Sequence, residues 1–237
     1  MQLFYHPTAL ENDKSFYFDK EESKHIVKVL RKNEGDILHV TNGLGTLFTT
    51  EIVQASPSKC EVNVISKITE QARAFGLHLA VAPTKLMDRY EWFLEKAVEI
   101  GVQTITPLIC DHSERTVIKL ERIEKIVLGA MKQSNQLFLP KINEVQHFKT
   151  FIKNQSETQK LIAHCEETNK FSLKGSLQPQ QSALILIGPE GDFSSKEIEL
   201  ALQNNYKPVS LGETRLRTET AAIVACHSFV FVNESLK

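Results

Sequence analysis

The chain has few cysteines and no long hydrophobic run. Its four cysteines, Cys60, Cys110, Cys165 and Cys226, are widely separated among 237 residues and form no Cys-x-x-Cys pair. Reduced, buried thiols are therefore expected, and neither disulfides nor a metal site. No apolar stretch reaches the length of a membrane span, and the first ten residues lack the charged and apolar regions of a signal peptide. The expected location is the cytoplasm, without membrane contact.

Several signatures of common enzymes are also absent. The sequence has no Gly-x-Gly-x-x-Gly and no Gly-x-x-x-x-Gly-Lys-Ser, which argues against a dinucleotide enzyme and a phosphate-loop ATPase. A missing Gly-x-Ser-x-Gly disfavours a serine hydrolase. The eight histidines show no metal-ligand spacing, so no metal is expected and structural roles are favoured for His25, His78, His112 and His227. A formal net charge of -1 excludes a wholly basic nucleic-acid binder, so any RNA-binding surface must be local.

Short strands and turns follow one another from residue 1 to about 68. Asn42-Gly43 and Ser56-Pro57-Ser58 are typical of hairpin turns, and one helix, Lys20–Leu30, interrupts the strands. The pattern predicts a small β-barrel of the PUA or OB-like kind, an architecture that often binds nucleic acid. The expected strands are Leu3–Tyr5, Ser15–Phe18, Asp36–Thr41, Gly45–Val53 and Cys60–Ile65.

Basic side chains gather near the end of that helix. Lys24, Lys28 and Arg31 fall at helical spacing on one side. A solvated helix face explains such charges most simply, and a patch that contacts phosphates is the functional alternative.

A polar stretch, Thr69–Arg73, precedes a change to alternating strands and helices. It predicts two domains, 1–70 and 71–237. The alternation predicts a mostly parallel sheet with helices on both faces. The expected strands are Leu77–Ala82, Thr104–Ile109, Leu161–Cys165, Ala183–Ile187 and Val209–Leu211. The expected helices are Leu86–Ile100, Leu120–Ser134, one that begins after Ser194, and Thr220–Val232. Gly101 is expected to end the first of these helices. The last helix is almost uncharged and should be buried against the sheet or another subunit.

The turn Gly188–Ser194 follows the apolar strand Ala183–Ile187. Ser194 and Glu197 have the spacing of a capping box, so a strand, a glycine turn and a capped helix are expected. Turns at the carboxyl ends of such strands commonly bind ligands, because their backbone amides are free. A tight connection without a ligand explains this stretch equally well.

A second turn of this kind, Leu211–Ala221, contains two arginines, two carboxylates and three threonines between a buried strand and an apolar helix. Charges at such a junction lose hydration, and this costs free energy unless they pair or meet a ligand. Capping of the helix by Thr218, with surface ion pairs of Arg217 and Glu219, is the simpler alternative. The density of polar groups favours a ligand or substrate role.

Together the two turns closely resemble the 16S ribosomal RNA uridine N3-methyltransferase family, whose members are knotted α/β methyltransferases of the SPOUT type. The resemblance rests on Gly188-Pro189-Glu190-Gly191-Asp192-Phe193-Ser194, Leu211-Gly212 and Leu216-Arg217-Thr218-Glu219-Thr220-Ala221, with weaker matches at Val29-Leu30-Arg31, Gly35-Asp36, Lys96, Glu99, Gly101 and Ser113-Glu114-Arg115. It covers essentially the whole chain. Gln2, Lys132 and Gln136 depart from the family pattern and affect expected RNA contacts more than the reaction.

The resemblance implies S-adenosylmethionine as methyl donor, a trefoil knot in the carboxyl-terminal domain, a homodimer, and 16S RNA or the small ribosomal subunit as substrate. It implies cofactor contacts from His164, Gly188, Pro189, Glu190, Gly191, Leu211, Gly212, Leu216 and Thr220. The three glycines would allow close approach of backbone to the adenine ring. The implied RNA contacts come from Lys24, Lys28, Arg31, Lys85 and Arg89.

Methyl transfer to N3 of uracil requires loss of the N3 proton, which leaves negative charge on the flanking carbonyl oxygens. An arginine aimed at them would stabilise that charge; Arg217 is the leading candidate and Arg115 the second. Glu219 or Glu190 could accept the proton, and Thr218 belongs to the same catalytic segment. Two alternatives stay open: a knotted methyltransferase acting on another RNA, such as transfer RNA, and a non-catalytic dimeric RNA-binding protein.

Overall fold

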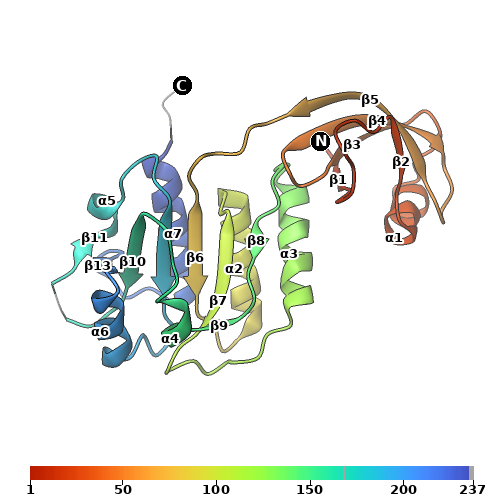
Figure 1. Cartoon of the computed structure of the whole chain (residues 1–237). Helices are drawn as coiled ribbons and strands as arrows, with labels where there is room; N and C mark the ends of the chain where they lie inside the picture. The colour runs from red at the N-terminus through yellow and green to blue at the C-terminus, as the bar shows by residue number, and fades with distance from the viewer. Residues whose placement is uncertain (168, 235–237) are drawn as a thin grey trace. The chain divides into compact units, whose positions relative to one another are not determined.

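The computed structural model describes residues 1–167 and 169–234 and divides into two compact units, each treated by itself (Figure 1). The smaller unit contains Met1–Ala72 and Met131–Leu139. The larger unit contains Arg73–Ala130 and the chain from Pro140 onward. The two-domain pattern of the sequence does not anticipate the return of Met131–Leu139 to the smaller unit.

The smaller unit is a five-stranded sheet in the order β1-β3-β4-β5-β2. β1 pairs with β3 in parallel and the other pairs are antiparallel. One face of the sheet buries a core with Phe4, Phe48 and Ile26, all at most 2% exposed. The expected small β domain and its two hairpins are confirmed. Its strands are β1 (Leu3–Tyr5), β2 (Ser15–Tyr17), β3 (Ile37–Thr41), β4 (Thr46–Gln54) and β5 (Glu61–Thr69).

The helix of this unit changes its winding part-way. Asp19 caps α1 (Lys20–Lys24) by accepting from the Glu22 amide, and the chain continues as a π-helix, η1 (His25–Val29). The Leu30 amide donates to the His25 carbonyl, five residues back. Arg31 then has a φ of 56°, in the left-handed region that most side chains avoid. The single helix predicted over Lys20–Leu30 is therefore wrong in its second half, because helical periodicity does not reveal a π-turn.

Residues 131–139 complete the smaller unit by packing against its β3–β4 hairpin. The Leu137 carbonyl accepts from the Thr41 hydroxyl at 3.2 Å, and the Leu139 amide donates to the Gly43 carbonyl at 2.9 Å. Lys132 pairs with Glu22 at 2.9 Å. Lys132, which departs from the family pattern, therefore has a structural partner within its own unit.

The larger unit is built on an eight-stranded sheet in which every pair is parallel, as the sequence predicts. The main order is β11-β13-β10-β12-β6-β7-β8, and β9 pairs with β7. β10 therefore lies between β12 and β13, and the loops that leave these three strands share one edge. The strands are β6 (Leu77–Val81), β7 (Thr104–Ile109), β8 (Lys141–Ile142), β9 (Gln146–His147), β10 (Gln159–Ala163), β11 (Phe171–Ser172), β12 (Ala183–Ile187) and β13 (Lys207–Ser210).

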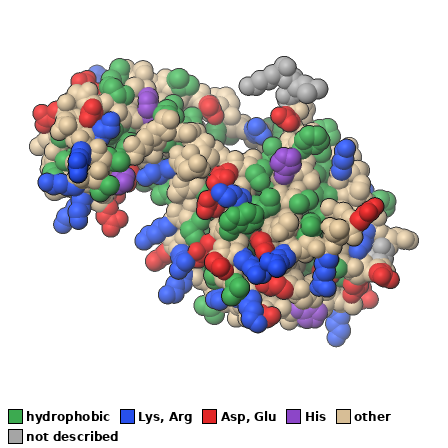
Figure 2. All heavy atoms as spheres, turned by 180° about the vertical axis from the view of Figure 1, so that it is seen from behind, with side chains coloured by type: hydrophobic (Ala, Val, Ile, Leu, Met, Phe, Trp, Pro, Cys, Tyr) green, Lys and Arg blue, Asp and Glu red, His purple; other side chains and the backbone are tan. Residues whose placement is uncertain are grey.

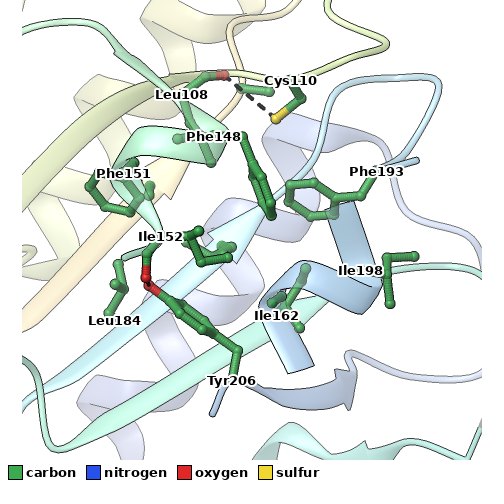
Figure 3. Close-up of a cluster of buried hydrophobic side chains, with 14 residues drawn as sticks. Leu108, Cys110, Phe148, Phe151, Ile152, Ile162, Leu184, Phe193, Ile198 and Tyr206 are labelled. Carbon is green, nitrogen blue, oxygen red and sulfur yellow. Dashed lines mark hydrogen bonds between the residues drawn. The ribbon is translucent and has the colours of Figure 1, made fainter. Parts of the chain in front are cut away.

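Helices cover both faces of this sheet (Figure 1). α2 (Met87–Ile100) and α7 (Thr218–Val232) pack together on one face, and α4 (Phe148–Phe151) and α6 (Ser195–Gln203) lie on the other. Successive side chains of buried β12 point to opposite faces of the sheet. Leu184 and Leu186 belong to the hydrophobic cluster on the side of α4 and α6 (Figure 3). The remaining helices of this unit are α3 (Leu120–Gln133), whose last residues belong to the smaller unit, and α5 (Leu173–Ser176).

Two predicted helix ends are confirmed. Gly101 ends α2 with a φ of 113°, and Ser194 with Glu197 forms a complete capping box on α6. All four cysteines are free. Cys60, Cys110 and Cys226 are buried, whereas Cys165 is exposed, so the expectation of a buried thiol is wrong there. Among the described residues no helix is long and apolar enough to cross a membrane, and no group of three or more His, Cys, Asp or Glu could hold a metal ion.

A partly buried polar cluster lies beside β6 and β7. His78 contacts the Glu157 carboxylate through Nδ1 at 2.5 Å and the Thr106 hydroxyl through Nε2 at 2.7 Å. Asn143 donates to the same hydroxyl at 2.8 Å. Burial opposes ionisation of Glu157, but the hydrogen bonds from His78 and the backbone hold the pKa of this carboxyl below its usual value. Ionised Glu157 therefore stabilises the fold.

Replacing Glu157 by Gln should lower the unfolding free energy at neutral pH by about 2 kcal/mol, because a charge-assisted hydrogen bond to buried His78 is removed. Since the pKa of Glu157 is lowered on folding, its contribution is present above its ordinary pKa and disappears as the pH falls through the lowered value. Thermal unfolding of wild type and variant should therefore converge in acid. Glu124→Gln, at an exposed position of α3, is the control and should show no difference. A gap between wild type and Glu157→Gln that persists in acid would contradict this assignment.

Candidate functional site

The two loops singled out in the sequence meet at the carboxyl edge of the parallel sheet. The loop after β12 contains Gly188–Ser194, and the loop after β13 contains Leu211–Arg217. The Thr218 hydroxyl, at the start of α7, donates to the Gly188 carbonyl at 3.1 Å and joins them directly. Because β10 lies between β12 and β13, the residues that follow it, 164–167 and 169–170, border both loops. Three loops thus form one site.

A first cavity of about 380 Å³ lies between the loops after β10 and β13. Its most unusual side chain is His164, which is 6% exposed and has no hydrogen-bond partner for either ring nitrogen among the described residues. Burial, and then the charge of Lys170, lowers the pKa of His164 and keeps the imidazole neutral. The cavity is lined by Ala163, His164, Cys165, Lys170, Val209, Ser210, Leu211, Gly212, Glu213, Thr214, Arg215, Leu216 and Ala221. Two unsatisfied buried nitrogens indicate a ligand with polar atoms.

A second cavity of about 330 Å³ lies beside the loop after β12 and shares five lining residues with the first. It brings carboxylates of one loop toward guanidinium groups of the other. The lining residues are Ala163, Cys165, Ile187, Gly188, Pro189, Glu190, Asp192, Arg215, Leu216, Arg217, Thr218 and Ala221. The shared residues make the two cavities parts of one cleft, with a histidine in one part and opposite charges in the other.

The loop after β12 is anchored by Phe193. This side chain is 2% exposed and lies 5.4 Å from the Phe148 ring, measured between ring centroids (Figure 3). A Cβ on Gly188 would come within 3.1 Å of the Phe193 ring, and a Cβ on Gly191 within 3.1 Å of His112. Only Gly212 meets the expected need for an unusual dihedral, with a φ of 143°. Packing within the protein therefore also favours glycine at 188 and 191, and their expected closeness to the adenine ring stays a prediction.

The loop after β13 offers unpaired polar groups. Within the part of the chain that the structure describes, residues 213–216 make no hydrogen bond or ion pair. Arg217 also lacks such a side-chain partner there, although it is the residue that precedes α7. Backbone amides, carbonyls and two guanidinium groups are thus available to a bound molecule.

Arg115 is used differently. Its Nε and Nη2 atoms donate to the Lys85 carbonyl at 3.2 and 2.9 Å, so the loop after β7 braces the loop after β6. The Lys85 amide donates to Glu190 at 2.9 Å, and the Lys85 side chain pairs with Glu114 at 2.8 Å. Arg115 therefore supports the site from outside the cleft.

The cleft gathers most of the residues predicted for the site. His164, Leu211, Gly212 and Leu216 line the first cavity; Gly188, Pro189, Glu190, Leu216, Arg217 and Thr218 line the second. Gly191, Thr220, Glu219 and Arg115 line neither. Thr218 makes no cap, because the capping position is Arg217 and no side chain caps this helix. The roles of these residues stay predictions.

Sequence reasoning missed several side chains of the cleft. Cys165 and Lys170 come from the loop after β10, and Asp192, Glu213 and Arg215 lie inside the two recognised motifs. The predicted strand Leu161–Cys165 ends at Cys165, and this could have indicated that residue, since neighbouring parallel strands end at one edge of the sheet. Nothing in the sequence distinguishes Asp192 from its neighbours, because its importance rests on backbone geometry.

Comparison with known proteins bears on this cleft and on both units. Residues 70–230 match a family model described as an RNA methyltransferase domain, and residues 18–65 match an RNA methyltransferase PUA domain. The chain belongs to the RNA methyltransferase family. The family match spans the whole of the loop-lined cleft, and the PUA match lies within the smaller unit.

Individual relatives extend over nearly the full chain. Ribosomal RNA small subunit methyltransferase E of Buchnera aphidicola is 33% identical, over 89% of this chain and 85% of that protein. The protein of the same name from Bacillus subtilis is 29% identical, over 96% and 94%. A solved structure of a probable rRNA-methyltransferase from Porphyromonas gingivalis is 40% identical, with a TM-score of 0.90 and 98% of each chain covered. A methyltransferase of Legionella pneumophila, solved in complex with the bound cofactor SAM, is 28% identical, with a TM-score of 0.86 and 99% of each chain covered.

Gly188→Ala should destabilise this RNA methyltransferase by about 1–3 kcal/mol, because the added methyl group would press on the buried Phe193 ring. The matched control is Gly129→Ala in α3, where an added Cβ meets nothing within 4 Å. That change should raise stability by about 0.5–1 kcal/mol, as alanine favours a helix. Thermal unfolding of both variants checks the pair, and a stable Gly188→Ala protein would show that the turn can move away from Phe193.

Proposed function

We propose that this chain transfers a methyl group from S-adenosylmethionine to N3 of one uridine in the 16S RNA of the small ribosomal subunit. The observation that carries the proposal is the two-part cleft at the carboxyl edge of the parallel sheet, with the unpaired nitrogens of His164 at one end and Arg217 at the other. Relatives named as small-subunit ribosomal RNA methyltransferases support the substrate class. A substrate of this kind places the protein in the cytoplasm.

The residues of the cleft fit S-adenosylmethionine. Each cavity has the volume of a small-molecule site, and together they offer room for an elongated ligand. The neutral His164 ring and the free backbone groups of residues 213–216 can bind a heterocycle and a ribose, while Glu190 and Arg215 offer charges to an amino-acid group. The Legionella relative solved with SAM supports this assignment. The predicted trefoil knot stays a prediction.

S-Adenosylmethionine, when bound, supplies a methyl group already activated on a sulfonium. The protein must therefore orient the uracil and stabilise the anion that forms when N3 loses its proton. Arg217 lines the second cavity without a protein partner in the described chain, so its guanidinium can turn toward the uracil oxygens. Arg115 is already bound to the Lys85 carbonyl and is the weaker candidate.

Two carboxylates compete for the role of base. Glu190 lines the second cavity, but one of its oxygens accepts from the Lys85 amide. Glu219 is 8% exposed in the first turn of α7 and lines neither cavity. Because Glu190 lines the second cavity and Glu219 does not, we favour Glu190 as the group that receives the N3 proton, with its second oxygen.

Arg217→Ala should reduce methyl transfer to small-subunit RNA by at least about 100-fold, since one charge-stabilising group is removed. It should leave the thermal unfolding temperature and the calorimetric affinity for S-adenosylmethionine close to wild type, because Arg217 has no protein partner to lose. Arg217→Lys is the matched variant that keeps the charge without the planar fork. Turnover near wild type in the alanine variant would remove Arg217 from the catalytic site.

Two other functions compete with this one. A methyltransferase for another RNA would bind the same cofactor and modify transfer RNA instead. A non-catalytic RNA-binding protein would give no heat with S-adenosylmethionine in calorimetry. The cleft with unsatisfied His164 nitrogens favours the enzyme over the second alternative.

The smaller unit is proposed to bind the RNA backbone. Lys24, Lys28 and Arg31 lie on α1, the π-helix and the turn that follows, and no acidic residue occurs between Glu22 and Glu34. Blue side chains gather at this end of the unit in Figure 2. Among the described residues none of these three cations has an ion-pair partner, so they are free to meet phosphates. Lys85 and Arg89, in the other unit, are proposed as further contacts.

Lys28→Ala combined with Arg31→Gly should weaken RNA binding and lower the slope of log K against log salt by about 1 for each phosphate that is no longer bound. Glycine is chosen at Arg31 because a φ of 56° strains alanine and most other replacements, so folding should be maintained. The control Gln180→Gly makes the same backbone change at a φ of 58° in the larger unit, and should leave RNA binding unchanged. Filter-binding titrations at several salt concentrations measure the slope. An unchanged slope in the double variant would exclude a phosphate role.

A homodimer is proposed through α7. This helix is apolar almost all round, and its outward side carries Val224, His227 and Phe231, the last of which is 57% exposed. Hydrophobic side chains are visible among charged ones on the face of the larger unit in Figure 2. An uncharged helix with an exposed side is typical of a surface covered by a second copy. Sedimentation equilibrium of the purified chain should give twice the chain mass; a monomer at micromolar concentration would contradict the proposal.

A further inference from the structure

Asp192 has a backbone conformation that its neighbours do not share. Its φ is +64°, in the left-handed region that favours glycine. Aspartate is one of the few other residues that adopt it, because its short side chain can bond nearby backbone groups. The Asp192 amide closes the turn by donating to the Pro189 carbonyl at 2.9 Å.

The Asp192 carboxylate uses both oxygens. Oδ1 accepts from the next amide, Phe193, at 2.9 Å, and Oδ2 accepts from the Cys165 amide at 2.6 Å. The first bond is local, whereas the second crosses from the loop after β12 to the loop after β10. It is short and charge-assisted, as expected of a strong hydrogen bond.

The Asp192 side of this bond is rigid. The His112 Nδ1 atom faces the Gly191 and Asp192 carbonyls at 3.0 and 3.1 Å, and must donate because a carbonyl only accepts. The next residue, Phe193, is anchored in the core. Removal of the carboxylate would therefore release the partner loop and leave the turn in place.

Among the described residues, few contacts hold the Cys165 side. Lys170 closes this loop on itself by donating to the His164 and Glu166 carbonyls at 3.0 and 2.7 Å. In the part of the chain that the structure describes, the other hydrogen bond from this loop to the chain after β12 is donated by the Ser195 hydroxyl, at the start of α6, to Glu166 at 2.6 Å. The Asp192 bond is the one beside the cleft, since Cys165 lines both cavities and its neighbour His164 lines the first.

We propose that Asp192 is a positioning residue that holds the loop after β10, and with it His164, against the methyl-donor cleft. This inference rests on the proposed function of the cleft. Asp192 acts through the Cys165 amide and not on the reacting atoms. Its removal should therefore weaken binding of S-adenosylmethionine and leave the chemical step unchanged.

The test compares Asp192→Gly with Asn205→Gly. Both changes place glycine at a left-handed position, with φ of 64° and 63°, but Asn205 is exposed and lines neither cavity. Asp192→Gly should raise the calorimetric Kd for S-adenosylmethionine about tenfold, which is the size expected for one charge-assisted hydrogen bond. KM for the cofactor should rise equally while kcat at saturation stays within about twofold of wild type. Asn205→Gly should change neither quantity.

Hydrogen exchange without cofactor gives an independent readout. The Cys165 amide should be protected in wild type and exchange faster in Asp192→Gly, because its acceptor is removed. If the glycine variant unfolds, Asp192→Asn takes its place, since asparagine tolerates this conformation and keeps one acceptor. Its Kd for S-adenosylmethionine and its Cys165 exchange rate should then lie between those of wild type and those expected when the bond is lost completely.

The outcomes separate this inference from the function on which it rests. Wild-type protein that binds no S-adenosylmethionine would refute the proposed function, and Cys165 exchange would still report the hydrogen bond. If wild-type protein binds S-adenosylmethionine and the Asp192 variant binds it with equal affinity, the positioning role alone is overturned. Unchanged exchange at Cys165 in the variant would overturn it as well.

Discussion

Burial of Phe193 is the interaction on which the rest of the cleft depends. Its ring packs against Phe148 and lies within 3.1 Å of where a Cβ at Gly188 would stand, so it anchors the turn after β12. From that fixed turn, Gly188 accepts from Thr218 and Asp192 accepts from Cys165, which brings the loops after β13 and β10 to it. A single apolar contact in the core thereby sets the distances between three polar loops.

Parallel pairing explains why these loops can meet at all. β12 and β13 both border β10, so segments that are far apart along the chain end at one edge. The polar groups of the site are thus placed by a sheet whose strands are entirely buried at β12 and β6. Rigid strands and short anchored turns are what a methyl-transfer site requires, because orientation of the reactants is a large part of the catalysis.

Much of this fold could be predicted from the sequence. The apolar run Ala183–Ile187, the capping box at Ser194 and Glu197, and the glycine after α2 each carry a local signal, and all three are confirmed. The turns after predicted strands located the two principal loops, and the resemblance to a methyltransferase family implied what they bind. Local signals fail where the cause is distant or conformational: the π-turn at His25–Val29, the return of residues 131–139, and the left-handed Asp192. The brace formed by Arg115 could not be predicted either, since its acceptor is a backbone carbonyl thirty positions away.

We propose that the cleft binds S-adenosylmethionine for methylation of N3 in ribosomal uridine. The most direct test of this proposal is mass spectrometry of nucleosides from 16S RNA, taken from small subunits that lack the modification and incubated with the purified chain and isotope-labelled S-adenosylmethionine. The account predicts one labelled N3-methyluridine per 16S molecule. Label in another nucleoside, or none despite measurable binding of the cofactor, would contradict it.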